Sequence, residues 1–157
     1  MNALILTGSP KGRKSASFAL ASKLAEWLRK NDVSVSLEPV HAGLRTEEGT
    51  RRLLDAVDGS DLVVLAFPLY VDSLPAPLTR LLELVAERRT RVASPGTPRL
   101  AAIVQCGFPE AHQCDTAVGI CRLFAERTGM RWAGALAMGM GGSIGGDIGR
   151  LPGGGKH

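Results

Sequence analysis

Aromatic residues, long apolar runs and clustered basic residues are all scarce in this sequence of 157 residues. Phe, Trp and Tyr together make up 4% of it, too few for the stacking platform on which proteins bind single-stranded nucleic acid. The net charge is +4, and no run of Lys and Arg is longer than two residues, so the sequence lacks a concentrated basic patch. We therefore expect no nucleic-acid partner.

Membrane-spanning, secretory and metal-binding patterns are missing as well. The longest apolar run, 62–71, is too short to span a bilayer and contains Pro68. The apolar start of the chain has no basic region before it, unlike a signal peptide. The three cysteines, Cys106, Cys114 and Cys121, have the spacing of neither a disulfide framework nor a zinc site. We expect a cytoplasmic protein without metal or membrane contact.

What the sequence does contain is an alternation of apolar strands and amphipathic helices. Apolar residues make up 45% of the chain, enough to bury the core of a single domain over residues 1–157. Strands are expected at 3–6, 33–37, 61–67, 99–106 and 131–140. Helices are expected after Ser15, after Thr46, around Pro77 and from about His112 to Thr128.

This alternation predicts an α/β fold with a doubly wound, five-stranded parallel sheet. The uninterrupted apolar run at 61–67 is typical of a central parallel strand, whereas the period of two at 33–37 indicates an edge strand. Strand orders 3-2-1-4-5 and 2-1-3-4-5 both fit the right-handed crossover rule. In either order ligands bind at the carboxyl ends of the strands, so the loops that follow the strands matter most.

The loop after the first strand, GSPKGRKSAS (8–17), is close to two known phosphate-binding motifs and matches neither. A P-loop that starts at Gly8 needs a glycine where Arg13 stands. A dinucleotide-binding loop needs a glycine where Pro10 stands. The sequence therefore favours neither a P-loop ATPase nor a dinucleotide-binding enzyme.

The same loop nevertheless has the chemistry of an anion site. Its three serines, Ser9, Ser15 and Ser17, offer hydroxyl groups at the expected start of a helix. A helix N-terminus adds free N–H groups and partial positive charge. Lys11 and Arg13 can add full positive charge. We therefore predict that this loop binds an anion.

The loops after the third and fourth strands are unusually apolar. The first of them, FPLYVDSLPAPLTRLLE (67–83), holds the only tyrosine of the chain, Tyr70. The second begins CGFPE (106–110), in which Gly107 permits close approach of the backbone and Phe108 is apolar. Apolar loops at the ligand-bearing edge of the sheet suit a flat apolar ligand or a partner subunit.

Taken together, these three loops resemble those of the flavodoxin-like NAD(P)H-dependent FMN reductase family. The resemblance covers essentially the whole chain, and it implies strand order 2-1-3-4-5 and FMN bound without metal. It also implies NAD(P)H as co-substrate and a homodimer in which the second loop meets the partner. By this resemblance the phosphate of FMN would be held by Ser9, Lys11, Ser15 and Ser17. The flavin ring would be lined by Pro68, Leu69, Tyr70, Val71, Cys106, Gly107 and Phe108.

The activity implied by the resemblance is that of an FMN-dependent oxidoreductase. Hydride would pass from NAD(P)H through bound FMN to a small electron acceptor: a quinone, a flavin, a nitro compound or a metal ion. One alternative is a flavodoxin-type electron carrier that does not oxidise NAD(P)H, and another is a non-enzymatic binding domain on the same fold. Flavodoxins are usually acidic with aromatic rings beside the flavin, so the basic charge and single tyrosine favour the reductase.

The glycine-rich end of the sequence raises two further points. Gly141 to Gly145 match the G-x-S-x-G of serine hydrolases, with Asp147 and His157 after it, but the glycines that follow disfavour the helix that a nucleophile elbow requires. The same glycines disfavour a last helix, although a doubly wound sheet needs helices on both faces. We expect that an amphipathic helix beyond His157 covers the second face, with a neighbouring subunit as the less favoured alternative.

Overall fold

The structure is a computed structural model that describes residues 1–91 and 96–141. Its centre is a parallel sheet in the order β2-β1-β3-β4-β5. The strands are β1 (Asn2–Thr7), β2 (Ser34–Pro39), β3 (Leu62–Pro68), β4 (Arg99–Gln105) and β5 (Arg131–Met138). The α-helices are α1 (Ala16–Lys30), α2 (Val40–Gly43), α3 (Glu47–Asp58), α4 (Ala76–Arg91) and α5 (Asp115–Arg127). The fold class and the strand order 2-1-3-4-5 are thus confirmed.

Two local features were not expected from the sequence. Helix α2 has four residues, too few to show a helical period, and it follows β2 directly. In β5, the pairing with β4 shifts between Leu100 and Ala101, where Gly134 has a φ of 109°. Because only glycine adopts this conformation without strain, Gly134 accommodates the irregularity and the strand continues past it.

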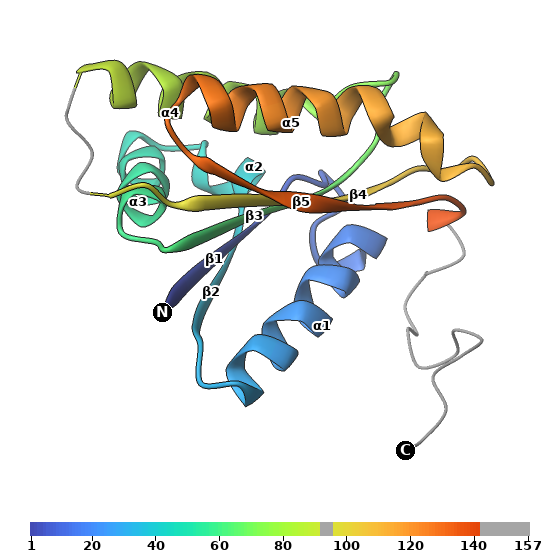
Figure 1. The fold of residues 1–157 in the computed structure, drawn as a ribbon, viewed down its shortest axis with the longest axis horizontal. Helices are drawn as coiled ribbons and strands as arrows, with labels where there is room; N and C mark the ends of the chain where they lie inside the picture. Colours follow the sequence, from blue (N-terminus) through green and yellow to red (C-terminus); the bar gives the residue numbers. More distant parts are fainter. Residues whose placement is uncertain (92–95, 142–157) are drawn as a thin grey trace.

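The helices divide unequally between the two faces of the sheet (Figure 1). Helices α2 to α5 cover one face, where a large core joins residues such as Leu53, Leu78 and Cys121 to the inward residues of the strands. Helix α1 lies on the opposite face and packs Ala21 and Ala25 against the sheet in a smaller core. The alternation of strand residues between the two cores follows from the period-two geometry of a strand.

Within residues 1–91 and 96–141, α1 is the only helix on its face. Trp27 of α1 is 61% exposed and Leu136 of β5 is 52% exposed. Both side chains border an apolar hollow of about 580 Å³ between α1 and strands β3 to β5. The expectation of an amphipathic helix beyond His157 falls outside the described residues and stays a prediction. We call this uncovered surface the open face.

Candidate functional site

A cavity of about 290 Å³ lies at the carboxyl edge of the sheet, where the loops after β1, β3 and β4 meet. The cavity lies at the switch point of the strand order. There β2 pairs with one side of β1, and β3 pairs with its other side. The residues that line the cavity are Ser9, Lys11, Lys14, Ser15, Ala16, Pro68, Leu69, Tyr70, Gln105, Cys106, Gly107 and Gly141. Three distant segments of the sequence therefore form one site.

The loop after β1 is held tightly against the sheet. Gly8 donates its N–H to the carbonyl of Ala66 at 2.9 Å, and a Cβ at Gly8 would lie 3.0 Å from Cβ of Phe67. Glycine is thus the residue that fits where this loop leaves the strand. Ser9 is 5% exposed, and its hydroxyl accepts a hydrogen bond from the N–H of Lys11 at 3.3 Å.

Ser15 begins α1, as the sequence predicts. Its hydroxyl accepts a hydrogen bond from the N–H of Phe18 at 3.1 Å and donates one to the carbonyl of Gly12 at 2.7 Å. The cap leaves the N–H groups of Ala16 and Ser17 in the first turn, where no intrahelical carbonyl reaches them. Ala16 lines the cavity, so one end of the cavity is formed by a helix N-terminus.

The charge around this helix N-terminus is positive. Lys11 and Lys14 both line the cavity, and none of its lining residues within 1–91 and 96–141 is acidic. Arg13, which the sequence analysis groups with Lys11, instead lies with its guanidinium 6.0 Å from the ring centre of Phe18. Two lysines together with the helix N-terminus make this end of the cavity attractive to an anion.

One buried hydroxyl near this loop has no hydrogen-bond partner. Thr7 is the last residue of β1 and is 2% exposed, and its Oγ1 makes no hydrogen bond. A buried hydroxyl without a partner is unfavourable by roughly 1–3 kcal/mol. The base of the loop therefore has unused hydrogen-bonding capacity directly before Gly8.

The loop after β3 forms the apolar wall and ends in a strained turn. Leu69 donates its N–H to the carbonyl of Gln105 at 2.8 Å, which ties the loop to β4. Tyr70 and Ser73 exchange two backbone hydrogen bonds, of 2.9 and 3.0 Å, around a two-residue turn. Within that turn Val71 has a φ of 46° and is 97% exposed. Positive φ is costly for a β-branched residue, and such strain is concentrated at functional sites.

The loop after β4 is fixed by the chain that follows β5. Gly141 donates its N–H to the carbonyl of Cys106, and Met140 donates to the carbonyl of Phe108, both at 2.7 Å. A Cβ at Gly141 would collide with the side chain of Gln105. The close approach of Gly141 to Gln105 therefore requires glycine and completes the wall of the cavity.

Two of the three cysteines, Cys114 and Cys121, are protonated at neutral pH. Burial raises the pKa of Cys114 to about 11, and a hydrogen bond with the Cys106 thiol contributes further. Burial alone raises the pKa of Cys121 to about 12. All three cysteines are buried free thiols. Cys114 and Cys121 are packing residues rather than nucleophiles.

Eight of the eleven residues predicted from sequence lie at this cavity: Ser9, Lys11, Ser15, Pro68, Leu69, Tyr70, Cys106 and Gly107. The other three lie beside it. Ser17 is fully buried behind Ser15 and donates a hydrogen bond to the Ser15 hydroxyl at 3.3 Å. Val71 and Phe108, which is 55% exposed, lie at the surface next to the cavity.

Sequence reasoning missed four of the residues that line the cavity: Lys14, Ala16, Gln105 and Gly141. Lys14 and Ala16 stand within the predicted anion loop, and the start of a helix could have pointed to them. Gln105, which is 8% exposed, is a polar residue at the end of an apolar strand, and this is a usable signal. Gly141 belongs to the GGSIG match, whose remaining residues lie outside the described residues.

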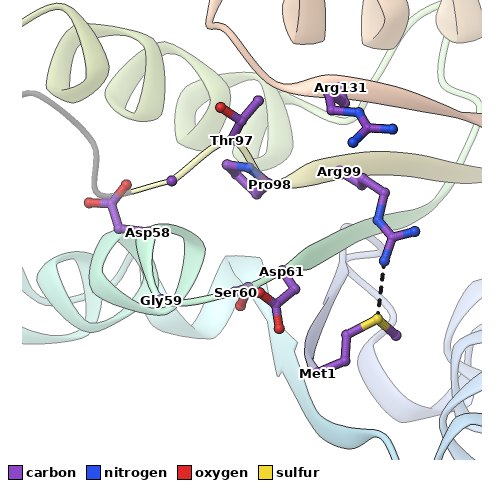
Figure 2. A pocket seen from close by; sticks show the side chains of 10 residues that line it. Met1, Asp58, Gly59, Ser60, Asp61, Thr97, Pro98, Arg99 and Arg131 are labelled. Atoms are coloured by element: carbon purple, nitrogen blue, oxygen red, sulfur yellow. Dashed lines mark hydrogen bonds between the residues drawn. The ribbon is translucent and has the colours of Figure 1, made fainter.

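A larger cavity of about 640 Å³ lies at the opposite, amino edge of the sheet (Figure 2). Arg99 and Arg131 border it as register partners on β4 and β5, and Asp58 and Asp61 also line it. Its acidic residues are already engaged: Asp58 accepts a hydrogen bond from Arg88, and Asp61 accepts one from the N–H of Asn2, both at 2.7 Å. This edge lies far from the loops that the sequence analysis selects.

An open parallel sheet with a cavity over its switch point, lined by a basic helix N-terminus, defines a flavodoxin-like α/β protein. The chain belongs to the family described as having a flavodoxin-like fold, because the sequence model of that family matches residues 1–131. A comparison with curated protein sequences finds no match to the chain. The described residues contain no helix long and apolar enough to cross a membrane.

Solved structures with the same fold include three of known type. An NADH:FMN oxidoreductase in its apo form has a TM-score of 0.69 and 20% identity, over 88% of this chain and 75% of that one. An azoreductase from Bacillus anthracis has a TM-score of 0.62 and 15% identity, over 85% of this chain and 86% of that one. A flavodoxin from Streptococcus pneumoniae TIGR4 has a TM-score of 0.62 and 15% identity, over 88% of this chain and 85% of that one. At these identities the similarity establishes the fold alone.

Proposed function

We propose that this chain is an FMN-dependent oxidoreductase that passes hydride from NAD(P)H to a small electron acceptor: a quinone, a flavin, a nitro compound or a metal ion. When bound, FMN supplies the redox chemistry, since it accepts hydride and passes electrons to the second substrate. The observation that carries the proposal is one cavity in which a basic, hydroxyl-lined helix N-terminus meets an apolar loop. Names of similar structures, an NADH:FMN oxidoreductase and an azoreductase, support the same reaction class.

The donors at the basic end fit a phosphate group. Ser9 and Ser15 contribute hydroxyls, Ala16 contributes a free N–H, and Lys11 and Lys14 contribute charge. The unpartnered hydroxyl of Thr7 lies at the base of the same loop. We expect these residues to bind the phosphate of FMN and to fix the position of the flavin.

The apolar end fits one side of a flavin ring. Pro68, Leu69 and Tyr70 form its apolar surface, and Gly107 leaves space because it has no side chain. A volume of about 290 Å³ is at the lower end of the range for small-molecule sites, roughly 300–1,000 Å³. The cavity can thus enclose part of the cofactor, and the residues at its rim are left to meet a second substrate.

We also propose that the chain forms a homodimer with Tyr70 at or near the interface. Tyr70 is 41% exposed, Val71 is 97% exposed and Phe108 is 55% exposed, so apolar side chains gather at the rim of the cavity. Leu74, from the same apolar loop, is 6% exposed and belongs to the core. Sedimentation at micromolar concentration tests the dimer, and a monomer that binds FMN would contradict it.

The test of the activity is spectroscopic. The protein is saturated with FMN and mixed anaerobically with NADH or NADPH. The absorption of the flavin at about 450 nm is then followed. We expect rapid bleaching by at least one of the two nucleotides and its reversal by a quinone. Tight FMN binding without bleaching would show an electron carrier instead. Failure to bind FMN would contradict both the reductase and the electron carrier, and would favour a non-enzymatic binding domain on the same fold.

A further inference from the structure

The side chain of Gln105 is a buried amide without a hydrogen-bond partner. It is 8% exposed, and no donor or acceptor within residues 1–91 and 96–141 bonds to it. A glutamine amide offers one acceptor and two donors, and its burial without a partner is unfavourable. Gln105 also lines the cavity at the carboxyl edge of the sheet. An unpaired amide in the wall of a cavity indicates that its partner is a ligand.

The alternation of strand β4 fixes the side of the sheet that this amide faces. Val104 belongs to the core beneath α2 to α5, and Ile103 belongs to the core beneath α1. Because successive strand residues point to opposite faces, Gln105 faces the α1 side. The N-terminus of α1, with Ala16, lines the same cavity. Gly141 lies directly against the amide, since a Cβ there would collide with the side-chain carbonyl of Gln105.

Gln105 and the basic loop lie at different ends of the cavity. In the strand order, β3 separates β4 from β1, so the ends of β4 and β1 are two strand spacings apart, about 10 Å at ~4.8 Å per spacing. The apolar residues Pro68 and Leu69 follow the strand between them and line the same cavity. A ligand with an anion at one end, a flat apolar body and a polar edge fits this order.

We propose that Gln105 recognises the imide edge of the flavin ring, where the N3–H group stands between two carbonyl groups. This inference rests on the proposed binding of FMN. The side-chain carbonyl of Gln105 accepts the N3–H, and its NH2 group donates to the adjacent flavin carbonyl. Glutamine binds the edge of adenine in the same two-point manner, because that edge also places a donor beside an acceptor. Among the described residues that line the cavity, Gln105 is the only side-chain amide.

The other polar groups of FMN suit this amide less well. The phosphate is an anion, and Lys11, Lys14 and the N-terminus of α1 attract it to the other end of the cavity. A ribityl hydroxyl pairs with an amide through one hydrogen bond at a time, whereas the imide edge engages the carbonyl and the NH2 group together. Gln105 is therefore a specificity-determining residue for the ring and not for the chain that carries it.

The first measurement uses the protein without flavin. Gln105→Leu replaces the amide with an apolar side chain of similar size. Because the amide has no partner in the described part of the chain, this change should leave the urea midpoint of unfolding the same or raise it. Gln113→Leu is the matched control, since Gln113 is the other glutamine of the chain, contacts His112 and does not line the cavity. A lower midpoint for Gln105→Leu alone would show that the amide supports the fold, and would overturn the proposal.

The second measurement compares FMN with N3-methyl FMN, in which a methyl group replaces the N3 proton. The wild type should bind N3-methyl FMN at least about tenfold more weakly than FMN, because a site built to bond a polar group rejects the analogue without it. Gln105→Leu should bind FMN about tenfold more weakly than the wild type does, and should bind both ligands equally. Gln113→Leu should behave as the wild type. Quenching of flavin fluorescence measures each affinity.

A third measurement observes the contact itself. The N3 proton of bound FMN, followed by NMR, should exchange with water more slowly in the wild type than in Gln105→Leu, because the hydrogen bond to the amide protects it. The comparison is made at FMN concentrations that saturate both proteins. Equal exchange rates would overturn the proposal, since a role of Gln105 in shaping the cavity alone would not protect this proton.

The outcomes separate this inference from the proposed function. If the wild type binds FMN and N3-methyl FMN equally, Gln105 does not recognise the imide edge, while FMN binding stands. If Gln105→Leu loses affinity for the two ligands by the same factor, the amide contacts the ribityl chain, which also overturns the proposal. If the wild type binds neither ligand, the inference and the proposed function are both wrong.

Discussion

Ser17 donates its hydroxyl proton to the hydroxyl oxygen of Ser15, and Ser15 lines the cavity at the start of α1. The Ser15 oxygen also accepts the N–H of Phe18, so one side chain both caps the helix and faces the ligand. Removal of this hydroxyl should therefore affect the stability of the chain and the affinity for FMN together. A different substitution can separate the two effects.

Ser15→Asp should keep the helix cap and lose FMN affinity, although its carboxylate cannot donate to the carbonyl of Gly12 as the serine hydroxyl does. Aspartate caps a helix as well as serine does, whereas alanine lowers the free energy of unfolding by about 1 kcal/mol. A carboxylate at residue 15 repels a phosphate, so its FMN affinity should fall at least as far as that of Ser15→Ala. Urea denaturation and FMN fluorescence titration measure the two quantities. FMN bound by Ser15→Asp as tightly as by the wild type would contradict the phosphate assignment.

Lys11→Gln combined with Lys14→Gln should weaken FMN binding about tenfold or more, because two cations near one phosphate each contribute about 1 kcal/mol. Riboflavin, which has no phosphate, should bind both proteins equally. Lys23→Gln is the control, since Lys23 is exposed on α1, away from the cavity, and pairs with Glu26. An equal loss for FMN and riboflavin would show that the lysines shape the site rather than bind phosphate.

Val71→Asn should raise the free energy of unfolding by about 1 kcal/mol, since asparagine tolerates positive φ and valine does not. Val71 is almost fully exposed, so the substitution removes no core packing. Val35→Asn, at a half-buried residue of β2, should have the opposite effect. Urea denaturation compares the three proteins. If Val71 contacts a second subunit, sedimentation of Val71→Asn will also show weaker dimerisation.

The buried thiol of Cys121 should make the fold sensitive to alkali. Its pKa is raised from 9.0 to about 12, so the folded chain retains the proton while the unfolded chain loses it above pH 9.0. The contribution of this thiol to stability is therefore complete below pH 9.0 and is lost as the pH rises towards 12. Cys121→Ala should show a smaller decrease in the free energy of unfolding between pH 8 and pH 10, roughly one unit on either side of the ordinary thiol pKa. Equal decreases in both proteins would contradict this assignment.

The fold was largely predictable because local chemistry and tertiary structure agree along most of the chain. Ser15 and Thr46 cap helices as their residue types predict, and both accept a backbone N–H three residues ahead. The apolar run of β3 lies at the centre of the sheet. Helix α2 and the irregularity at Gly134 could not be predicted, since four residues show no period and strand register depends on the neighbouring strand.

The candidate site was predictable as loops but not as individual contacts. The rule that ligands bind at the carboxyl ends of strands selected the three segments that meet at one cavity. It could not show that Arg13 lies against Phe18 while Lys14 lines the cavity, because side-chain direction depends on the turn at Gly12–Lys14. Nor could it show that the chain after β5 returns to the site, where Gly141 contacts Gln105.

The candidate flavin cavity and the arginines beside the open face, Arg99 and Arg131, lie at opposite ends of the same strands. Strand β4 runs from Arg99 to Gln105, about 20 Å at ~3.3 Å per residue, and its ladders to β3 and β5 make it a rigid spacer. Among residues 1–91 and 96–141, no element with two alternative arrangements is seen at either end, and such an element is what energetic coupling between distant sites requires. Occupancy of one end should therefore leave the affinity at the other unchanged. A molecule bound at the arginine end would thus hold the protein in one place without changing the FMN affinity that we propose for the other end.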